Sequence, residues 1–135
     1  MMARVKALLI SADPDLRRIL GVALGSARRR TRAGWDFLEA SNGLEGLRLA
    51  WREMPDVVVA DEIASGAGAF AVAKDLRGAE HPFPGAIVII LARPLDAWLA
   101  KWSGADAWFP RPVDPFALSD KVVELVGTPS TEESA

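Results

Sequence analysis

At residues 55–61 the chain reads Pro-Asp-Val-Val-Val-Ala-Asp, a short apolar β-branched run that ends on the carboxylate of Asp61. An uninterrupted apolar run of this length is typical of a strand buried on both faces of a parallel sheet. Open α/β sheets bind ligands at the carboxyl ends of their strands, which would place Asp61 at a binding edge. The glycine-containing segment that follows, residues 62–70, predicts a loop and then a helix. Asp61 could equally cap that helix, so the local sequence leaves both interpretations open.

Length and composition predict one domain that spans residues 1–127, followed by a disordered tail or linker at 128–135. The chain has 135 residues, half of them hydrophobic, and a net charge of −2. The absence of Cys excludes disulfides and thiol chemistry, and a single His argues against imidazole metal sites. No apolar run approaches the ~18 residues that a membrane span needs. We therefore expect a cytoplasmic protein without a membrane partner, and the charge makes nucleic acid an unlikely partner.

Apolar runs alternate along the chain with segments of helical period, which predicts an α/β fold with a parallel sheet. The expected strands cover residues 5–10, 35–40, 57–60, 86–91 and 107–109. The expected helices begin at Asp13-Pro14 and end near 25–28, then cover 43–54, 70–76, 95–103 and 115–126. Helical spacing predicts that the first helix buries Leu16, Ile19, Leu20, Ala23 and Leu24 and the second Leu44, Leu47 and Trp51.

The order of elements and the residues between them resemble the receiver domain of bacterial response regulators, the CheY-like, flavodoxin-like fold. The resemblance covers about residues 4–127 and is carried by 13–18 (DPDLRR), 39–43 (EASNG), 55–61 (PDVVVAD), 104–108 (GADAW) and 111–114 (RPVD). It implies a three-layer α/β/α sandwich with five helices and five parallel strands in the order 2-1-3-4-5.

The resemblance also implies a phosphoryl-accepting aspartate, and Asp61 has that position. An acidic pair that helps to hold Mg²⁺ belongs after the first strand, but Ser11 and Ala12 stand there and neither supplies a carboxylate. Asp13 lies one residue further on. It could reach a metal if the loop slipped, but its position before Pro14 also makes it a helix N-cap. The expected cofactor is therefore none, or weakly bound Mg²⁺ on Asp61 and Asp13.

Three further receiver positions follow the fourth and fifth strands. Leu91 replaces the hydroxyl residue that binds the phosphoryl group, and it offers no hydrogen bond. Arg111 replaces the lysine, keeps the positive charge, and could pair with Asp61 in a bidentate manner. By resemblance the bond before Pro112 is cis. Trp108 occupies the position of the aromatic switch residue, and beside Leu91 we expect it to be packed and fixed.

Two surface features have alternative interpretations. Trp98 and Trp102 lie one turn apart on the fourth helix, at positions that are usually buried and usually exposed, respectively. They could anchor an interface or fill space left by a loop two residues shorter than usual. The basic cluster of Arg28, Arg29, Arg30 and Arg32 is expected in an enlarged loop after the first helix. It could be merely solvated, or it could bind an acidic partner or nucleic acid.

The resemblance places the chain in two-component signal transduction, and the altered positions favour a degenerate, phosphorylation-independent pseudo-receiver that acts by binding proteins. The implied partners are signalling proteins, including a histidine kinase, and a second copy bound through the face of the fourth helix, fifth strand and fifth helix. A working receiver phosphorylated on Asp61, with an atypical Mg²⁺ site, is the alternative. We expect no enzyme, because no nucleophile–base pair or glycine-rich phosphate motif is present.

Overall fold

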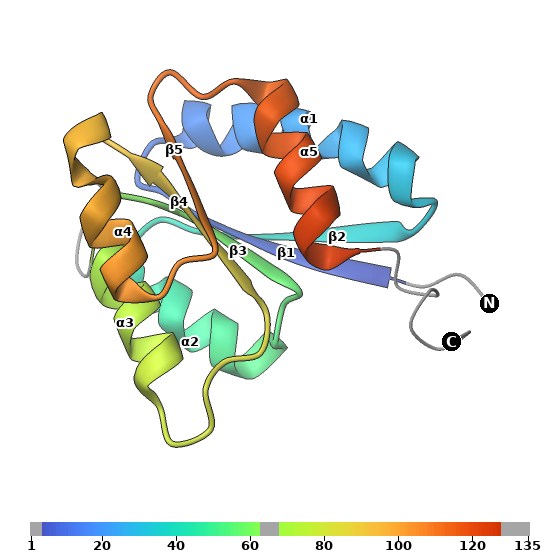
Figure 1. Ribbon diagram of the computed structural model, residues 1–135. Helices are drawn as coiled ribbons and strands as arrows, with labels where there is room; N and C mark the ends of the chain where they lie inside the picture. Colours follow the sequence, from blue (N-terminus) through green and yellow to red (C-terminus); the bar gives the residue numbers. More distant parts are fainter. Residues whose placement is uncertain (1–3, 63–67, 128–135) are drawn as a thin grey trace.

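The computed structural model describes residues 4–62 and 68–127 and contains one five-stranded parallel sheet (Figure 1). The strands span Arg4–Ile10 (β1), Gly34–Ala40 (β2), Val57–Asp61 (β3), Ala86–Leu91 (β4) and Ala107–Pro110 (β5). Their order is β2-β1-β3-β4-β5, and every neighbouring pair is parallel. The predicted sheet order is therefore confirmed. The tail expected at 128–135 lies outside the described residues.

Helices cover both faces of the sheet and complete the predicted three-layer sandwich. They span Pro14–Thr31 (α1), Gly43–Glu53 (α2), Ala69–Gly78 (α3), Ala97–Ser103 (α4) and Pro115–Val126 (α5), with a 3-10 turn at Pro94–Asp96 (η1). Figure 1 shows α1 and α5 on one side of the sheet and α2, α3 and α4 on the other. None of these helices is both long and apolar enough to cross a membrane.

Alternating side chains of the central strands supply two separate cores. Val57 and Val59 of β3 pack with α1 and α5, whereas Val58 and Ala60 pack with the helices of the opposite face. Because both faces are covered, β4 and all of β3 except its last residue, Asp61, are apolar without alternation, and only the first residue of β4 is partly exposed. This burial fixes the register of the strands, so the positions of their carboxyl ends are fixed as well.

The first helix is longer than the sequence predicts. Asp13 caps its N-terminus, as expected, and accepts a hydrogen bond from the backbone N–H of Asp15. The predicted end near residues 25–28 is wrong, because the helix continues to Thr31. Arginine is a good helix former, and the helix ends only where Arg32 adopts a left-handed conformation with φ of 56°. The basic cluster therefore lies in the last helical turn and its cap, not in an enlarged loop. Ile19, predicted to be buried, is exposed.

The second helix packs mainly through small residues and through only one of the three predicted large ones, Leu47. Leu44 and Trp51 are exposed, while Gly46 and Ala50 face the sheet. A Cβ atom on Gly46 would lie 2.3 Å from Cδ1 of Ile10, so glycine allows the helix to approach β1 closely. Leu47 packs against the core as predicted. The prediction was wrong for Leu44 and Trp51, because hydrophobic periodicity gives weight to large side chains and none to a glycine contact.

The remaining helices differ from prediction only at their ends. The third extends one residue earlier and two later than predicted. The segment expected as one helix from residue 95 is divided into η1 and α4, with Asp96 at the junction. The strand β5 includes Pro110, and α5 has the predicted limits.

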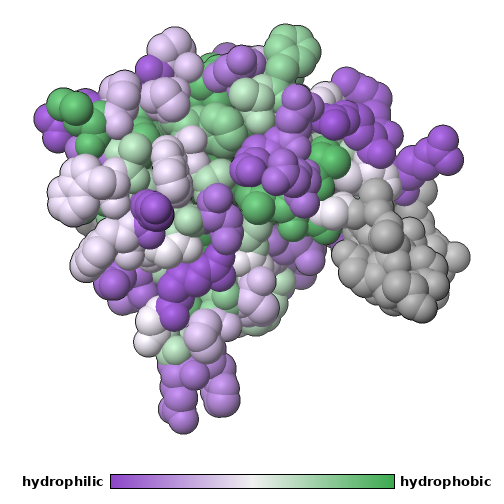
Figure 2. Space-filling model, viewed as in Figure 1, coloured by the Kyte–Doolittle hydropathy of each residue, from purple (hydrophilic) through white to green (hydrophobic). Residues whose placement is uncertain are grey.

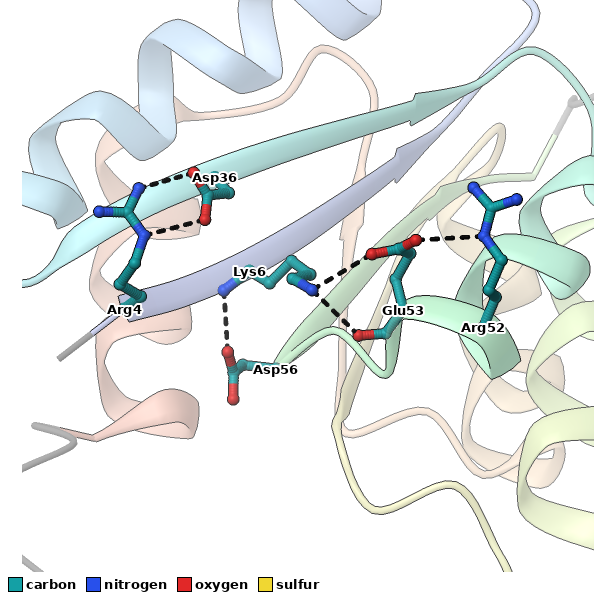
Figure 3. Close-up of polar contacts among 6 residues, drawn as sticks. All are labelled: Arg4, Lys6, Asp36, Arg52, Glu53 and Asp56. Carbon is teal, nitrogen blue, oxygen red and sulfur yellow. Dashed lines mark hydrogen bonds and ion pairs between the residues drawn. The ribbon is translucent and has the colours of Figure 1, made fainter.

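Polar contacts fasten the amino-terminal edge of the sheet, where β1, β2 and β3 begin (Figure 3). The ammonium group of Lys6 donates 3.3 Å hydrogen bonds to the backbone carbonyl and the carboxylate of Glu53, at the end of α2. The backbone N–H of Lys6 donates to Asp56 at 2.8 Å. These three hydrogen bonds tie β1 to the end of α2 and to the connection that leads into β3.

Candidate functional site

Three strand ends meet at the carboxyl-terminal edge of the sheet and bring together the residues that the sequence singled out. Asp61 is the last residue of β3, Ser11 follows β1, and Arg111 follows β5. Because the strands are parallel and in register, their carboxyl ends lie at one edge. The interpretation of Asp61 as a mere helix cap has no support, since Gly68 is the N-cap of α3.

Asp61 is an almost completely buried carboxylate held by two donors. Only 1% of the residue is exposed. Its Oδ2 accepts hydrogen bonds from Ser11 Oγ at 2.8 Å and from Arg111 Nη2 at 2.6 Å. Among the described residues, Oδ1 of Asp61 and Nε of Arg111 have no partner. The predicted pairing of Asp61 with Arg111 is present, but through a single hydrogen bond rather than in the expected bidentate form.

Ser11 does more than replace an acid. Its hydroxyl donates to Asp61 and also accepts a 3.0 Å hydrogen bond from the backbone N–H of Asp13. Its carbonyl accepts a 2.7 Å hydrogen bond from Nη1 of Arg17. The sequence interpretation treated Ser11 only as a missing carboxylate. The signal that it missed is a hydroxyl directly after a buried strand, where it can reach the next strand end.

The metal ligands that the resemblance implies do not assemble. The carboxylate of Asp13 accepts from the N–H of Asp15, as a helix cap does, and Ala12 has no ligand atom in its side chain. In residues 4–62 and 68–127, no group of three His, Cys, Asp or Glu side chains is placed to hold a metal ion. A Mg²⁺ ion prefers near-octahedral oxygen coordination with one or two carboxylates. Oδ1 of Asp61 is a free oxygen, but the described residues do not provide the usual acidic pair beside it.

Leu91 and Trp108 belong to the hydrophobic core. Leu91 is 1% exposed and packs in the cluster on the α2, α3 and α4 side, and the partly buried Trp108 packs against the same cluster. The backbone N–H of Arg111 donates to the Leu91 carbonyl at 3.1 Å, and the Arg111-Pro112 bond is cis, as expected. The expected packing of Trp108 is confirmed.

Glu62 connects the end of β3 to the segment after β4. Its Oε1 accepts a 3.0 Å hydrogen bond from the backbone N–H of Ala92. Burial raises the pKa of Glu62, and the neighbouring Asp96 carboxyl raises it further. The neighbouring Glu62 carboxyl and the Arg93 guanidinium lower the pKa of Asp96. This contact between Glu62 and the segment that leads into α4 was not identified from the sequence.

The two tryptophans of α4 are both on the surface. Trp98 is 66% exposed, although its position is usually buried, and Trp102 is 59% exposed. The interpretation that both fill space left by a short loop is therefore wrong. The ammonium group of Lys74 lies 4.0 Å from the centre of the Trp102 ring.

Known proteins share both the sequence pattern and the fold. An uncharacterised response regulatory protein of Mycobacterium tuberculosis is 30% identical over 126 residues, which cover 93% of this chain and 94% of that protein. The chain belongs to the receiver family of response regulators. The transcriptional regulatory protein GlrR of Escherichia coli is 31% identical to this receiver, whose match covers 28% of that longer protein. No protein-family model matches the chain.

A solved structure confirms the receiver fold. The receiver domain of the sensor histidine kinase PA1611 from Pseudomonas aeruginosa has a TM-score of 0.77, with 17% identity over 93% of this chain and 99% of that one. That crystal structure has a magnesium ion in its active-site cleft. The present receiver is thus a domain of two-component signalling, and Asp61, the expected acceptor, lies beside Ser11 and Arg111.

Proposed function

We propose that this receiver acts as a phosphorylation-independent interaction module, a pseudo-receiver with no enzymatic activity of its own. The observation that carries this proposal is the environment of Asp61. Its side chain is 2% exposed, and Arg111 and Ser11 already satisfy one of its oxygens. The cation that a phosphoryl group would need is therefore already engaged by the carboxylate itself.

Charge supports the same conclusion. Phosphoryl transfer depends mainly on positioning and on neutralising the negative charge that gathers on the acceptor and the phosphoryl oxygens. In this receiver Arg111 is the one cation that contacts Asp61 among the described residues, and the implied acidic pair is replaced by Ser11 and Ala12. Leu91 supplies no hydroxyl for a phosphoryl oxygen. The residues present do not fit the family's Mg²⁺ site, so we derive no step through that ion.

We propose that α4 carries the partner surface, as the α4-β5-α5 face does in the family. Trp98 and Trp102 are four residues apart on α4, and the 79% exposed Leu95 lies in the preceding turn η1. Exposed tryptophans dominate the binding energy of many interfaces. A signalling protein or a second copy of this receiver would bury them, whereas a surface this apolar does not favour nucleic acid.

One observation favours the alternative of a working phosphoacceptor. Oδ1 of Asp61 is a buried oxygen without a partner in the described part of the chain, and such atoms are uncommon in native structures. An acceptor aspartate needs one oxygen free for the phosphoryl group. The related receiver of PA1611 binds magnesium in its cleft, and weak Mg²⁺ binding at Asp61 with help from Asp13 would be the equivalent here.

A titration with Mg²⁺ and beryllofluoride, followed by tryptophan fluorescence, separates the two functions. Beryllofluoride imitates a phosphoryl group on aspartate, and Trp108 on β5 would report a change near the site. We expect no saturable response from the folded protein. A saturable response that disappears in Asp61→Asn would overturn the proposal and establish a working acceptor.

A further inference from the structure

A second polar site lies at the amino-terminal edge of the sheet, opposite the edge that holds Asp61. It is a pocket of about 450 Å³ at the starts of β1 and β2 and the end of α1. Four arginines and a short stretch of chain line it: Arg4, Arg28, Arg29, Arg32, Ala33, Gly34 and Trp35. Figure 2 shows hydrophilic residues gathered at the right of the molecule, where Figure 1 places the end of α1.

The fold brings these arginines together from two segments of the sequence, Arg4 and residues 28–32. Arg28 and Arg29 lie in the last turns of α1. Arg32 has a left-handed backbone conformation and turns the chain toward β2. Arg4 begins β1 and is in register with Gly34, the first residue of β2. The arginines therefore surround a concave site rather than forming a stripe along one helix.

Neighbouring residues hold the Arg4 side chain in place, and one nitrogen of its guanidinium group does not donate to Asp36. Its Nε and Nη2 donate to the two carboxylate oxygens of Asp36 at 3.0 and 2.6 Å. Figure 3 shows the third nitrogen, Nη1, directed away from Asp36. A Cβ atom on Gly34 would lie 2.5 Å from Nη1 and 3.0 Å from Cζ. The absence of a side chain at Gly34 therefore leaves room for the Arg4 guanidinium group. Asp36 fixes the orientation of that group.

The pocket has a surplus of positive charge in a chain whose net charge is −2. Arg28, Arg29 and Arg32 form no ion pair with any residue of the described ranges, whereas Arg30 pairs with Asp120 at 2.5 Å. The carboxylate of Asp36 compensates the positive charge of Arg4. The partial negative charge at the carboxyl-terminal end of α1 offsets about half of one further positive charge. More than two positive charges remain uncompensated within one pocket.

We propose that this pocket binds a polyphosphate anion. Guanidinium groups match phosphate oxygens through paired hydrogen bonds, and four arginines line this pocket. The volume lies within the range of about 300–1,000 Å³ that is usual for small-ligand pockets. A compact anion with several charges fits a concave site of this kind better than an extended chain does. The polyphosphate could belong to a free small molecule or to the phosphorylated headgroup of a lipid.

The test is isothermal titration calorimetry of the folded chain with inorganic tripolyphosphate at low ionic strength. We expect saturable binding with one site per chain and an affinity that falls as salt is added. The absence of saturable binding overturns the proposal. A second titration uses phosphatidylcholine vesicles that contain phosphatidylinositol bisphosphate. Vesicle binding that tripolyphosphate displaces assigns the site to a headgroup, and tripolyphosphate binding without vesicle binding assigns it to a free anion.

Two variants locate the binding. The triple variant Arg28→Gln, Arg29→Gln, Arg32→Asn removes three charges, and Asn tolerates the left-handed backbone of residue 32. We expect it to bind roughly 30-fold more weakly, because each exposed charge-assisted contact contributes about threefold. Gly34→Ala leaves the charge unchanged but displaces the Arg4 guanidinium, and should weaken binding several-fold. Unchanged affinity in both variants, with normal thermal unfolding, contradicts the proposal.

A matched control separates a built site from general attraction. The variant Arg18→Gln, Arg48→Gln, Arg52→Gln removes three exposed arginines outside the pocket and changes the net charge equally. We expect its affinity for tripolyphosphate to remain within about threefold of the unmodified protein. A loss as large as that of the pocket variant would show that binding follows net charge and would refute the site.

Discussion

Removal of the Arg111 guanidinium tests whether Asp61 is locked by its ion pair. The variant Arg111→Gln leaves a carboxylate with 2% side-chain exposure and only Ser11 as a donor. Removing one partner of a buried ion pair costs about 3–5 kcal/mol. Because the Arg111 side chain is 29% exposed, solvent screens part of the interaction, and we expect a loss of about 2–3 kcal/mol. For a domain of this size that lowers Tm by roughly 10 °C.

The assay is urea unfolding of a double-mutant cycle. Asp61→Asn alone should cost about 1 kcal/mol, because the partly exposed arginine can turn toward solvent. The double variant Asp61→Asn, Arg111→Gln should be more stable than Arg111→Gln alone, since no charge is left buried. A positive coupling energy of about 1–2 kcal/mol is expected from the cycle. If the free energy of unfolding of Arg111→Gln lies within about 0.5 kcal/mol of that of the unmodified protein, the ion pair contributes nothing to stability and the reasoning is refuted.

Three further predictions concern other parts of the fold. Burial raises the pKa of Glu62, so the free energy of unfolding should fall as the pH rises from the ordinary carboxyl pKa through the raised one. The variant Glu62→Gln should remove that fall. In thermal scans its Tm should exceed that of the unmodified protein at pH 8 but not at pH 4. Gly46→Ala forces a Cβ against the buried Ile10 and should cost about 1–3 kcal/mol in urea unfolding, whereas an unchanged midpoint would mean that α2 shifts freely. The double variant Trp98→Ala, Trp102→Ala should keep stability within about 0.5 kcal/mol and reduce partner binding or dimerisation at least tenfold, measured by light scattering and by co-purification; retained binding would remove α4 from the interface.

The sheet was predictable because its strands are buried on both faces. Uniform apolar runs such as 57–60 and 86–91 are typical of strands buried on both faces of a parallel sheet. The spacing between these runs leaves room for the helical crossover that parallel strands need. Helix boundaries and faces were less predictable. The end of α1 depends on the backbone conformation of Arg32, and the inward face of α2 depends on Gly46, which carries no hydrophobic signal.

The sequence predicted which residues form the site better than it predicted the hydrogen bonds between them. The resemblance placed Asp61 and Arg111 together, and the structure confirms their ion pair. It did not show that Ser11 donates to Asp61, or that Glu62 reaches Ala92, because both hydrogen bonds join strand ends that lie far apart in the chain. The exposure of Trp98 was also unexpected, since it depends on how the shortened segment before α4 is folded.

The central claim is that Asp61 does not accept a phosphoryl group. Its most direct test is the intact mass of the protein after incubation with Mg²⁺ and a small-molecule phosphodonor. A matched variant with the family's groups restored, Ser11→Asp, Ala12→Asp, Leu91→Thr and Arg111→Lys, serves as the positive control. We predict that the unmodified protein keeps its mass while the restored variant gains one phosphoryl group. A phosphoryl adduct on the unmodified protein that is lost in Asp61→Asn would contradict the account.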